Sequence, residues 1–530
     1  MKITNPILKG FNPDPAIIRV EDDYYIATST FEWFPGFQIH HSKDLKNWKL
    51  INHVLTRSSQ LDMKGAPDSC GVWAPCLTFD NGTFYAIFTN VKSFDGVWKD
   101  TPNFMVTTDD IQKGEWSEPI YLNSSGFDAS LFHDDDGRKW FLNMIVDHRG
   151  GKFFGGVYLQ EYDSEQNKLV GPIKNIFPGT ELGCTEAPHI YKRNGWYYLM
   201  TAEGGTEYGH AVTLCRSKNI WGPYELHPTN PVITARNNPD LPLQKSGHAS
   251  IVKTQTGDWY AAFLVGRPLK KHGRCTLGRE TAIAPVEWRE DGWLYHKGDN
   301  NEPQLEVEVE GLPESPWQPE PVRDDFDSEK LNVNFSSLRV PVNENWATLK
   351  ERPGFLRLYG RESLQSIHEQ SLVARRIQAF NVEAATCFEF SPDTFQQMAG
   401  LVFYYNTMHM HYAHVSYNEE TDTKYLQIIS ADNGAFSEPL ESIVEIIGDR
   451  VYLKGNMNRE DLQFYYSLDD ENWEKLGPVL DASILSDDYV RDNGLHYRAA
   501  FTGSFVGICC QDLSGRKKHA DFDWFEYKEL

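Results

Sequence analysis

The sequence predicts an all-β protein in which a five-bladed β-propeller is followed by a β-sandwich. A hairpin pattern that recurs five times between residues 14 and 260 indicates the propeller. Convincing amphipathic helical segments are scarce, which argues against an α/β barrel. Short strand-like runs separated by turns fill the second half and indicate the sandwich. The 530 residues also exceed what one hydrophobic core usually organises, so at least two domains are expected.

The five repeats share one order of residues. Each has a polar or aromatic lead residue, two small residues or prolines, an apolar pair, a turn and an aromatic-rich strand. The lead residues are Asp14, Trp73, Asp128, Glu186 and His248. Their separations of 59, 55, 58 and 62 residues suit four-stranded propeller blades. Asn-Gly or Asp-Gly turns in three of the five repeats indicate that a tight hairpin opens each blade.

The five lead residues are predicted to form one ring. The innermost strand of each blade lines the central channel, so equivalent positions on five blades converge. A lone Asp before proline, as at Asp14, is usually only a turn residue. Convergence of three carboxyls favours a catalytic pocket instead, because clustered carboxyls can keep one acid protonated while another stays ionised. Glycoside hydrolysis needs such a pair.

Segments around the acidic lead residues resemble glycoside hydrolase family 43, and more narrowly its two-domain β-xylosidases. They are residues 10–15 (GFNPDP), 126–130 (GFDAS) and 185–189 (TEAPH). Further matching segments lie at 72–75 (VWAP), 246–250 (SGHAS), 277–281 (LGRET) and 501–507 (FTGSFVG), so the resemblance covers nearly the whole chain. It implies a five-bladed β-propeller followed by a concanavalin-like β-sandwich.

The resemblance implies an inverting mechanism with three acidic residues. Asp14 is expected to be the general base that activates water, and Glu186 the general acid. Asp128 is expected to modulate the pKa of the acid and to orient it. In an inverting enzyme the acid and the base stand about 6.5–9.5 Å apart, which leaves room for the water.

Four propeller residues are expected to bind substrate. Arg279 is expected to be the lone cation of the acidic pocket and to donate to sugar hydroxyls, with an ion pair to a neighbour such as Glu280 as the alternative. Phe31 and Trp73 are expected to form apolar walls, although a Trp at a blade start is often a core residue. His248 is expected to contact the pocket, with a purely structural histidine as the alternative, and no metal is assigned to it.

The domain boundaries follow the composition. Residues 1–311 are assigned to the catalytic propeller, 312–323 to a Pro- and Glu-rich linker, and 324–530 to the sandwich. The sandwich is expected to pack on the propeller and help close the pocket, rather than to act as a carbohydrate-binding module. Phe505 is expected to be the residue that closes it, with a place in the sandwich core as the alternative.

Two further sequence features bear on the site. Residues 145–149 read IVDHR where the resembling enzymes usually carry Trp at the second position, so Val146 puts the leaving-group preference in doubt. The acidic residues Asp324, Asp325, Asp521 and Asp523 are interpreted as solvated turn residues rather than as calcium ligands.

Composition narrows the partners and the compartment. The formal net charge of −24 disfavours nucleic acid and anionic membranes and leaves a neutral substrate unaffected. The first residues lack a secretory signal, and no apolar run reaches the ~18 residues of a membrane span. Eight cysteines without CxxC pairs suit a reducing cytoplasm, and a secreted protein lacking its leader is the alternative.

The function predicted is exo-acting release of xylose from the non-reducing ends of short β-1,4-xylooligosaccharides. The nearest alternative is α-L-arabinofuranosidase activity, alone or together with the first, because the two pentoses present similar atoms. A non-catalytic glycan-binding propeller is a more distant alternative. No cofactor is implied, because hydrolysis needs only water and two carboxyls. The resemblance also implies a homo-oligomer, either a dimer or a tetramer.

Overall fold

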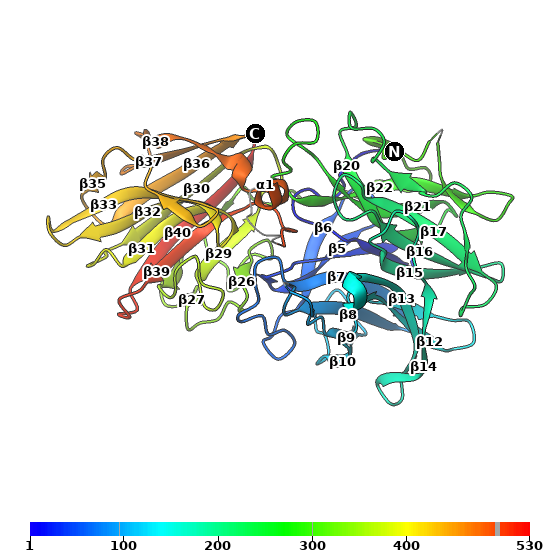
Figure 1. Ribbon diagram of the computed structural model, residues 1–530. Coiled ribbons are helices and arrows are strands. Elements are labelled where there is room, and N and C mark those ends of the chain that lie inside the picture. The colour runs from blue at the N-terminus through cyan, green and yellow to red at the C-terminus, as the bar shows by residue number, and fades with distance from the viewer. Residues whose placement is uncertain (95, 299, 493–498) are drawn as a thin grey trace.

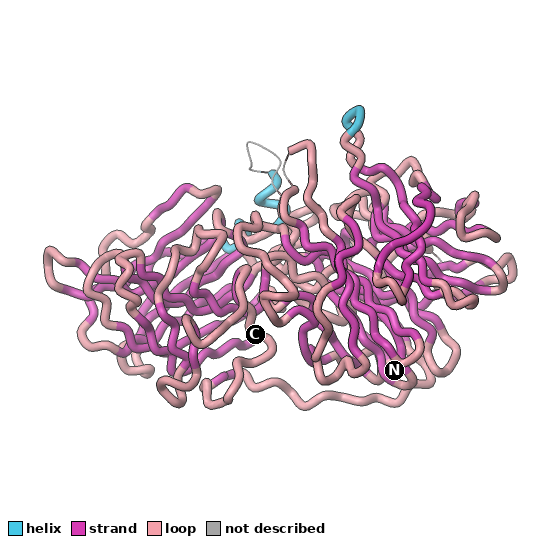
Figure 2. The backbone as a smooth tube through the Cα atoms, turned by 90° about the horizontal axis from the view of Figure 1, so that it is seen from below, coloured by secondary structure: helices cyan, strands magenta, loops and turns pink. Residues whose placement is uncertain are grey.

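A computed structural model describes residues 1–94, 96–298, 300–492 and 499–530. The chain forms two all-β bodies side by side, with the N-terminal half on the right in Figure 1 and the C-terminal half on the left. Strands supply nearly all of the regular structure (Figure 2). Among the described residues the one α-helix is α1 (Asp487–Asp492), and two short 3-10 turns lie at Arg149–Gly151 and Ala482–Ile484.

The N-terminal body contains five antiparallel sheets whose strands follow chain order. Blade 1 contains β2 (Ala16–Val20), β3 (Asp23–Thr28), β5 (Gly36–Ser42) and β6 (Lys49–Leu55). Blade 2 contains β7 (Gly71–Asp80), β8 (Thr83–Val91), β9 (Asn103–Thr108) and β10 (Ile120–Asn123). Blade 3 contains β11 (Ser130–His133), β12 (Lys139–Val146), β13 (Phe154–Asp163) and β14 (Lys168–Phe177). Blade 4 contains β15 (Glu186–Arg193), β16 (Trp196–Glu203), β17 (Ala211–Ser217), β18 (Glu225–Leu226) and β19 (Ile233–Thr234). Blade 5 contains β20 (Gln244–Lys253), β21 (Trp259–Gly266), β22 (Arg279–Trp288) and β23 (Leu294–His296).

These sheets confirm the predicted five-bladed propeller, and every predicted hairpin opens a blade. The ring is closed by the N-terminal segment, which runs along the fifth blade. The Asn5 side chain donates to Ile283 O at 2.8 Å and accepts from Ile283 N at 2.9 Å. Next to it, β1 (Lys2–Thr4) pairs with β24 (Glu306–Glu308). The first and fifth blades are therefore held together by hydrogen bonds between segments almost 300 residues apart.

The C-terminal body is a sandwich of two antiparallel sheets, as predicted. One sheet contains β25 (Arg323–Asp324), β27 (Ala347–Thr348), β28 (Leu356–Tyr359), β30 (Asn381–Phe390), β36 (Arg450–Asn458), β37 (Asp461–Ser467), β38 (Glu474–Asp481) and β40 (His519–Glu529). The other contains β29 (Ser371–Arg376), β31 (Gln397–Asn406), β32 (His409–Asn418), β33 (Thr423–Asp432), β34 (Ala435–Ser437), β35 (Val444–Ile446) and β39 (Phe505–Asp512). Alternating apolar side chains from both sheets fill the core between them.

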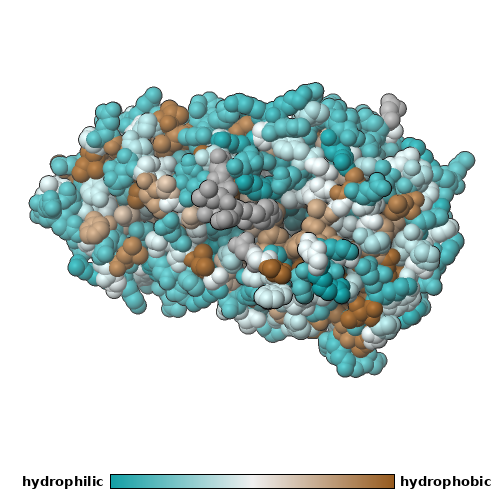
Figure 3. Space-filling view, viewed as in Figure 1, coloured by the Kyte–Doolittle hydropathy of each residue, from teal (hydrophilic) through white to brown (hydrophobic). Residues whose placement is uncertain are grey.

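The two bodies share a packed interface. In it β4 (Trp33–Phe34) of the propeller pairs with β26 (Ser337–Leu338) at the start of the sandwich. Around this pair one continuous apolar cluster includes propeller and sandwich side chains. The face in Figure 3 is covered mainly by hydrophilic residues, with apolar residues scattered among them. No helix in the described part of the chain has the length and apolar character needed to cross a membrane.

Candidate active site

All five lead residues of the repeats line one cavity of about 360 Å³. They are Asp14, Trp73, Asp128, Glu186 and His248. The three carboxyl-bearing side chains come from blades 1, 3 and 4, so they approach the cavity from different directions. The repeat in the sequence therefore corresponds to a ring in space.

The backbone at the ring is strained in the same way in every blade. A left-handed φ, which residues other than glycine adopt rarely, occurs at the lead residue or at the next one. These residues are Asp14 (58°), Ala74 (26°), Asp128 (53°), Ala187 (50°) and His248 (49°). In blades 2, 4 and 5 a register shift between the first two strands accompanies it. Such strain is typical of functional sites, where it fixes the direction of a side chain.

Asp14 is buried and held by three polar neighbours. Ser29 donates to its Oδ2 at 2.6 Å, and Arg279 Nη1 donates to its Oδ1 at 3.0 Å. The Nδ1 of His248 lies 3.4 Å from the same Oδ1. Burial alone would raise the pKa of Asp14, but Arg279 and these neighbours together hold it below the ordinary value. Since burial lowers the pKa of His248, Arg279 supplies the permanent charge, and Asp14 is ionised at neutral pH.

The pKa values of Glu186 and Asp128 are shifted in the opposite direction to that of Asp14. Burial, reinforced by the negative charge of Asp14, raises the pKa of Glu186 to about 8. Burial and the charges of Glu186 and Asp14 raise the pKa of Asp128 well above its ordinary value. The cavity therefore holds a protonated Glu186 opposite an ionised Asp14 at neutral pH, which is the distribution that acid–base chemistry needs.

Arg279 joins the charged and apolar parts of the cavity. Its Nη1 donates to Asp14 and to Thr206 Oγ1, each at 3.0 Å, and its Nη2 donates to Phe501 O at 3.0 Å. The suggested alternative partner, Glu280, instead pairs with Arg267 at 2.6 Å. The expectation of a lone cation was wrong, because Arg491 of α1 also lines the cavity.

Aromatic side chains form the apolar walls, as proposed for Phe31 and Trp73. The ring centroids of these two residues are 5.6 Å apart, and both residues line the cavity. The sequence analysis did not identify the other aromatic residues of the lining, which are Phe94, Phe127, Phe153, Phe154 and Phe501. Phe127 directly precedes Asp128 in a segment that carried the resemblance, so its position was a usable signal.

Phe505 does not close the pocket, which corrects the sequence-based expectation. It is fully buried at the start of β39 and stacks on Trp33, with ring centroids 3.7 Å apart, inside the interface between the two bodies. The cavity instead receives Phe501, from the same segment but before the strand begins. The segment 501–507 was therefore correctly expected to reach the pocket, but through Phe501 rather than Phe505. Phe505 lies in the strand, and its ring packs between the domains.

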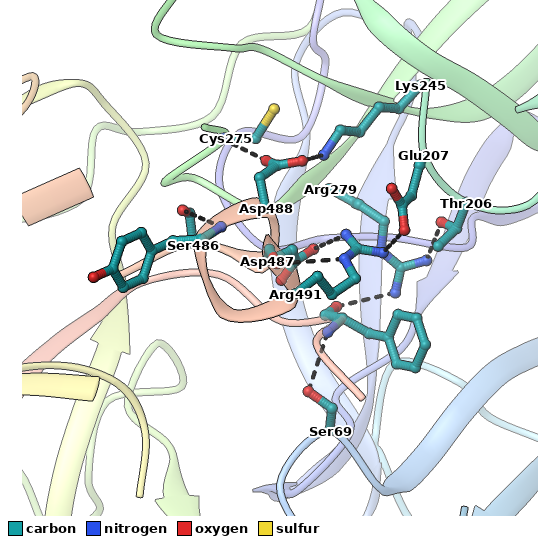
Figure 4. A network of polar contacts seen from close by, with 12 residues as sticks. Ser69, Thr206, Glu207, Lys245, Cys275, Arg279, Ser486, Asp487, Asp488 and Arg491 are labelled. Carbon is teal, nitrogen blue, oxygen red and sulfur yellow. Dashed lines mark hydrogen bonds and ion pairs between the residues drawn. The ribbon is translucent and has the colours of Figure 1, made fainter. Parts of the chain in front are cut away.

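The sandwich is anchored beside the cavity by α1 (Figure 4). Asp488 accepts from Lys245 Nζ at 2.6 Å and from Cys275 N at 2.9 Å, and Arg491 pairs with Glu207. Lys245 is almost fully buried, so this ion pair lies within the domain interface rather than on the surface. The second domain therefore contributes both a wall and an arginine to the cavity.

His210 is a further lining residue that the sequence analysis missed. Its Nδ1 lies 3.0 Å from Lys245 O, and burial lowers its pKa to about 3, so the imidazole is neutral. A Cβ on Gly247 would lie 2.4 Å from the His210 ring, so the glycine beside His248 makes room for it. Val146, in contrast, pairs with Phe154 in the sheet and is absent from the described lining, where Phe153 and Phe154 take part.

Comparison with known proteins agrees with this geometry. The family model of Glycosyl hydrolases family 43 matches residues 3–294, and that of the Beta xylosidase C-terminal Concanavalin A-like domain matches residues 323–528. A beta-xylosidase of Bacillus subtilis (strain 168) is 51% identical over 100% of both chains. Xylosidase/arabinosidase 43B of Humicola insolens is 49% identical over 100% of this chain and 98% of its own.

A solved structure is equally similar. The crystal structure of xylan beta-1,4-xylosidase from Bacillus halodurans C-125 superposes with a TM-score of 0.96 at 55% identity, covering 99% of this chain and 100% of that one. The predicted family resemblance and the predicted fold are both confirmed. The chain is a glycosidase that belongs to glycoside hydrolase family 43, with the concanavalin A-like C-terminal domain of its β-xylosidases.

Proposed function

We propose that this glycosidase releases single xylose units from the non-reducing ends of β-1,4-xylooligosaccharides with inversion of configuration. Glu186 protonates the glycosidic oxygen, and Asp14 removes a proton from the water that attacks the anomeric carbon from the opposite face. Asp128 orients Glu186 and the sugar, and it stays protonated because burial and the charges of Glu186 and Asp14 would oppose its ionisation. Arg279 keeps Asp14 ionised and donates to hydroxyl groups of the bound sugar.

The observation that carries this proposal is the opposite ionisation of two carboxyls in one cavity, those of the buried Asp14 and the partly buried Glu186. Asp14 is held ionised by Arg279, and Glu186 is held protonated by burial and by the charge of Asp14. A protein that only binds glycans gains nothing from an acid maintained opposite a base, because the pairing costs desolvation energy. The distribution of charge is that of a general acid and a general base.

The cavity supports action at chain ends. At about 360 Å³ it lies near the lower end of the range of ligand pockets, about 300–1,000 Å³. Phe501 and Arg491 of the second domain cover one side of it. A cavity of this size suits the terminal residue of a short oligosaccharide better than an internal stretch of a long chain.

Proton NMR of xylobiose hydrolysis tests the proposal. Within the first minutes the released non-reducing-end sugar should appear as α-xylose, before mutarotation mixes the anomers. Early β-xylose would contradict inversion and the base role of Asp14. Absence of cleavage of xylobiose and of aryl β-xylosides would contradict the proposed function itself.

A second, weaker activity on α-L-arabinofuranosides is proposed for the same cavity. The similarity to Xylosidase/arabinosidase 43B over the full chain supports it. Rates on the two 4-nitrophenyl glycosides, the β-D-xylopyranoside and the α-L-arabinofuranoside, should both fall strongly in Asp14→Asn if one site serves both, because hydrolysis of either sugar needs the general base even when the leaving group needs no acid. Retention of the arabinoside activity in that variant would contradict a shared site.

Cytoplasmic location and homo-oligomer formation stay proposals. No disulfide joins the eight cysteines in the described part of the chain, and seven of them are buried, which is compatible with a reducing compartment. Sedimentation equilibrium of the purified chain measures the oligomeric state directly, and a single 60.8 kDa species would contradict the dimer or tetramer.

A further inference from the structure

Ser69 connects two aromatic walls of the cavity, Trp73 and Phe501. It is fully buried at the propeller face that meets the sandwich, ahead of β7. Its own φ of 58° lies in the left-handed region that residues other than glycine rarely adopt. Strain of this kind persists only where the surroundings fix the residue, and the contacts of Ser69 show what fixes it.

Each polar group of Ser69 makes a hydrogen bond, and two of the three reach aromatic walls of the cavity. Its backbone N donates to Glu32 Oε1 at 3.1 Å, next to Phe31 in the chain. Its backbone O accepts from the indole Nε1 of Trp73 at 2.9 Å. Its side-chain Oγ accepts from the backbone N of Phe501 at 3.1 Å. Two of these partners belong to the propeller and the third to the sandwich.

The peptide groups of Phe501 are held from both sides by the propeller. Ser69 Oγ accepts from its N, and Arg279 Nη2 donates to its O at 3.0 Å. The Phe501 ring then lies 5.3 Å from Trp73 and 6.1 Å from Phe31, centroid to centroid. Because the N–H of Phe501 is buried, loss of its acceptor leaves an unpaired donor and favours movement of this segment.

We propose that Ser69 is a positioning residue that fixes Phe501, the wall supplied by the second domain, against the propeller half of the sugar site. This inference rests on the proposed function, because it assumes that Phe501 contacts the terminal pentose of the substrate. Ser69 does not touch the reacting atoms. It acts by setting the distance between Phe501 and the rings of Trp73 and Phe31, and so the fit of the pocket to one sugar ring.

Replacement of Ser69 by Ala or Gly tests the inference. Both variants lose the hydroxyl acceptor, and glycine also relieves the left-handed backbone, so the pair separates the hydrogen bond from strain. A wall that contacts the sugar equally in the ground and transition states acts on KM. We expect KM for xylobiose to rise about tenfold in both variants, with kcat changed less than about threefold.

Ser504→Ala is the matched control. Ser504 is also buried at the domain interface, and its Oγ donates to Thr276 O across that interface at 2.7 Å, away from the cavity lining. This variant loses one interdomain hydrogen bond without touching Phe501, and its KM should equal that of the wild type. Equal KM values for the Ser69 and Ser504 variants would overturn the inference.

A crystal structure of Ser69→Gly separates this inference from the proposed function. Displacement of the Phe501 backbone and ring supports the role of Ser69 whatever the enzyme hydrolyses. An unmoved Phe501 overturns it, even if xylobiose is the substrate. Wild-type protein that fails to cleave xylobiose would contradict the proposed function, and the crystal structure alone would then decide the role of Ser69.

Discussion

Buried carboxylates occur in both domains, but their partners differ. In the cavity, Asp14, Asp128 and Glu186 lie together, and the hydrogen bonds of Arg279 to this group go to Asp14. In the sandwich, Asp521 on β40 is equally buried, yet Arg357 binds both of its oxygens at 2.7 and 2.9 Å, and Arg352 binds one at 2.9 Å. In the cavity one arginine bonds directly to one of the three acids, whereas in the sandwich two arginines bond to the single carboxylate of Asp521.

The pKa value of each carboxyl depends on how many arginines contact it. In the sandwich, burial would raise the pKa of Asp521, but hydrogen bonds from both arginines lower it, so the group stays ionised. In the cavity, the pKa of Asp14 is lowered while that of Glu186 is raised to about 8. A carboxylate that two arginines bind directly stays ionised and forms part of a structural ion cluster. Where only Asp14 is bonded to an arginine, the acids divide into one ionised member and two members, Glu186 and Asp128, whose pKa values are raised, and this division supplies the chemistry.

Loss of the protonated acid should have the largest effect. Glu186→Gln removes the proton donor, and general acid catalysis contributes about 10²–10⁴-fold, so kcat for xylobiose should fall about 10³-fold. Glu203→Gln is the control: Glu203 is buried on the next strand and accepts from Thr180 and Thr185, outside the cavity lining. Steady-state kinetics of both variants measures the two effects. Similar losses of kcat in both would show that the loss in Glu186→Gln comes from damaged folding rather than from the missing proton donor.

Asp128→Asn should have an intermediate effect. The amide keeps the shape but removes the carboxyl that orients Glu186, so kcat should fall about 100-fold with KM little changed. Asp134→Asn, in the same blade, removes a buried carboxylate that binds Lys192 and Tyr197 instead. If the Asp134 variant loses as much activity, the role assigned to Asp128 is not supported.

The pH dependence should report the divided pair. The active form requires ionised Asp14 and protonated Glu186, so kcat/KM should fall about tenfold per pH unit above about 8, as Glu186 loses its proton. Because the pKa of Asp14 is lowered below 3.8, the acid limb should lie below the ordinary range of carboxyls. A profile of kcat/KM between pH 4 and 10 should show the alkaline limb and no acid limb. An alkaline limb near pH 5 would show that Glu186 is not the acid.

The ring could be predicted from the sequence, whereas the contribution of the sandwich could not. Asp14, Asp128 and Glu186 occupy equivalent repeat positions, and a repeat converts sequence position into spatial position. Phe501 and Phe505 lie outside the repeats, so their positions in space could not be predicted in this way. Both lie in one motif, and only docking of the two domains decides which ring enters the cavity and which stacks on Trp33.

The same limit applies to partners that are distant in the chain. The sequence shows Asp521 and Asp523 as a pair of acids, which suggested solvated turn residues. The structure places Asp521 between Arg352 and Arg357, more than 160 residues earlier, because β28 and β40 are neighbours in one sheet. Charge balance depends on strand pairing, so a list of acidic residues alone does not separate a structural cluster from a catalytic one.

The smallest effect on activity is expected for the sandwich cluster, where Arg357→Met should leave kcat/KM unchanged. Stability should fall, because breaking a buried ion pair costs about 3–5 kcal/mol and Arg352 still compensates part of it. We expect about 2 kcal/mol, or a thermal midpoint about 5 °C lower at pH 7 by calorimetry. Arg289→Met, which removes an exposed pair with Glu287, should change neither quantity.

The sign of the pH dependence separates this cluster from the catalytic one. The pKa of Asp521 is depressed in the folded state, so its stabilisation is complete above the unfolded value of about 3.9 and disappears as the pH falls through the folded value. The difference in thermal midpoint between wild type and Arg357→Met should therefore be constant from pH 7 to about 5 and shrink below about pH 4. A difference that instead vanished near pH 8, where Glu186 titrates, would show that the two clusters are coupled and that the division between structural and catalytic carboxylates is incorrect.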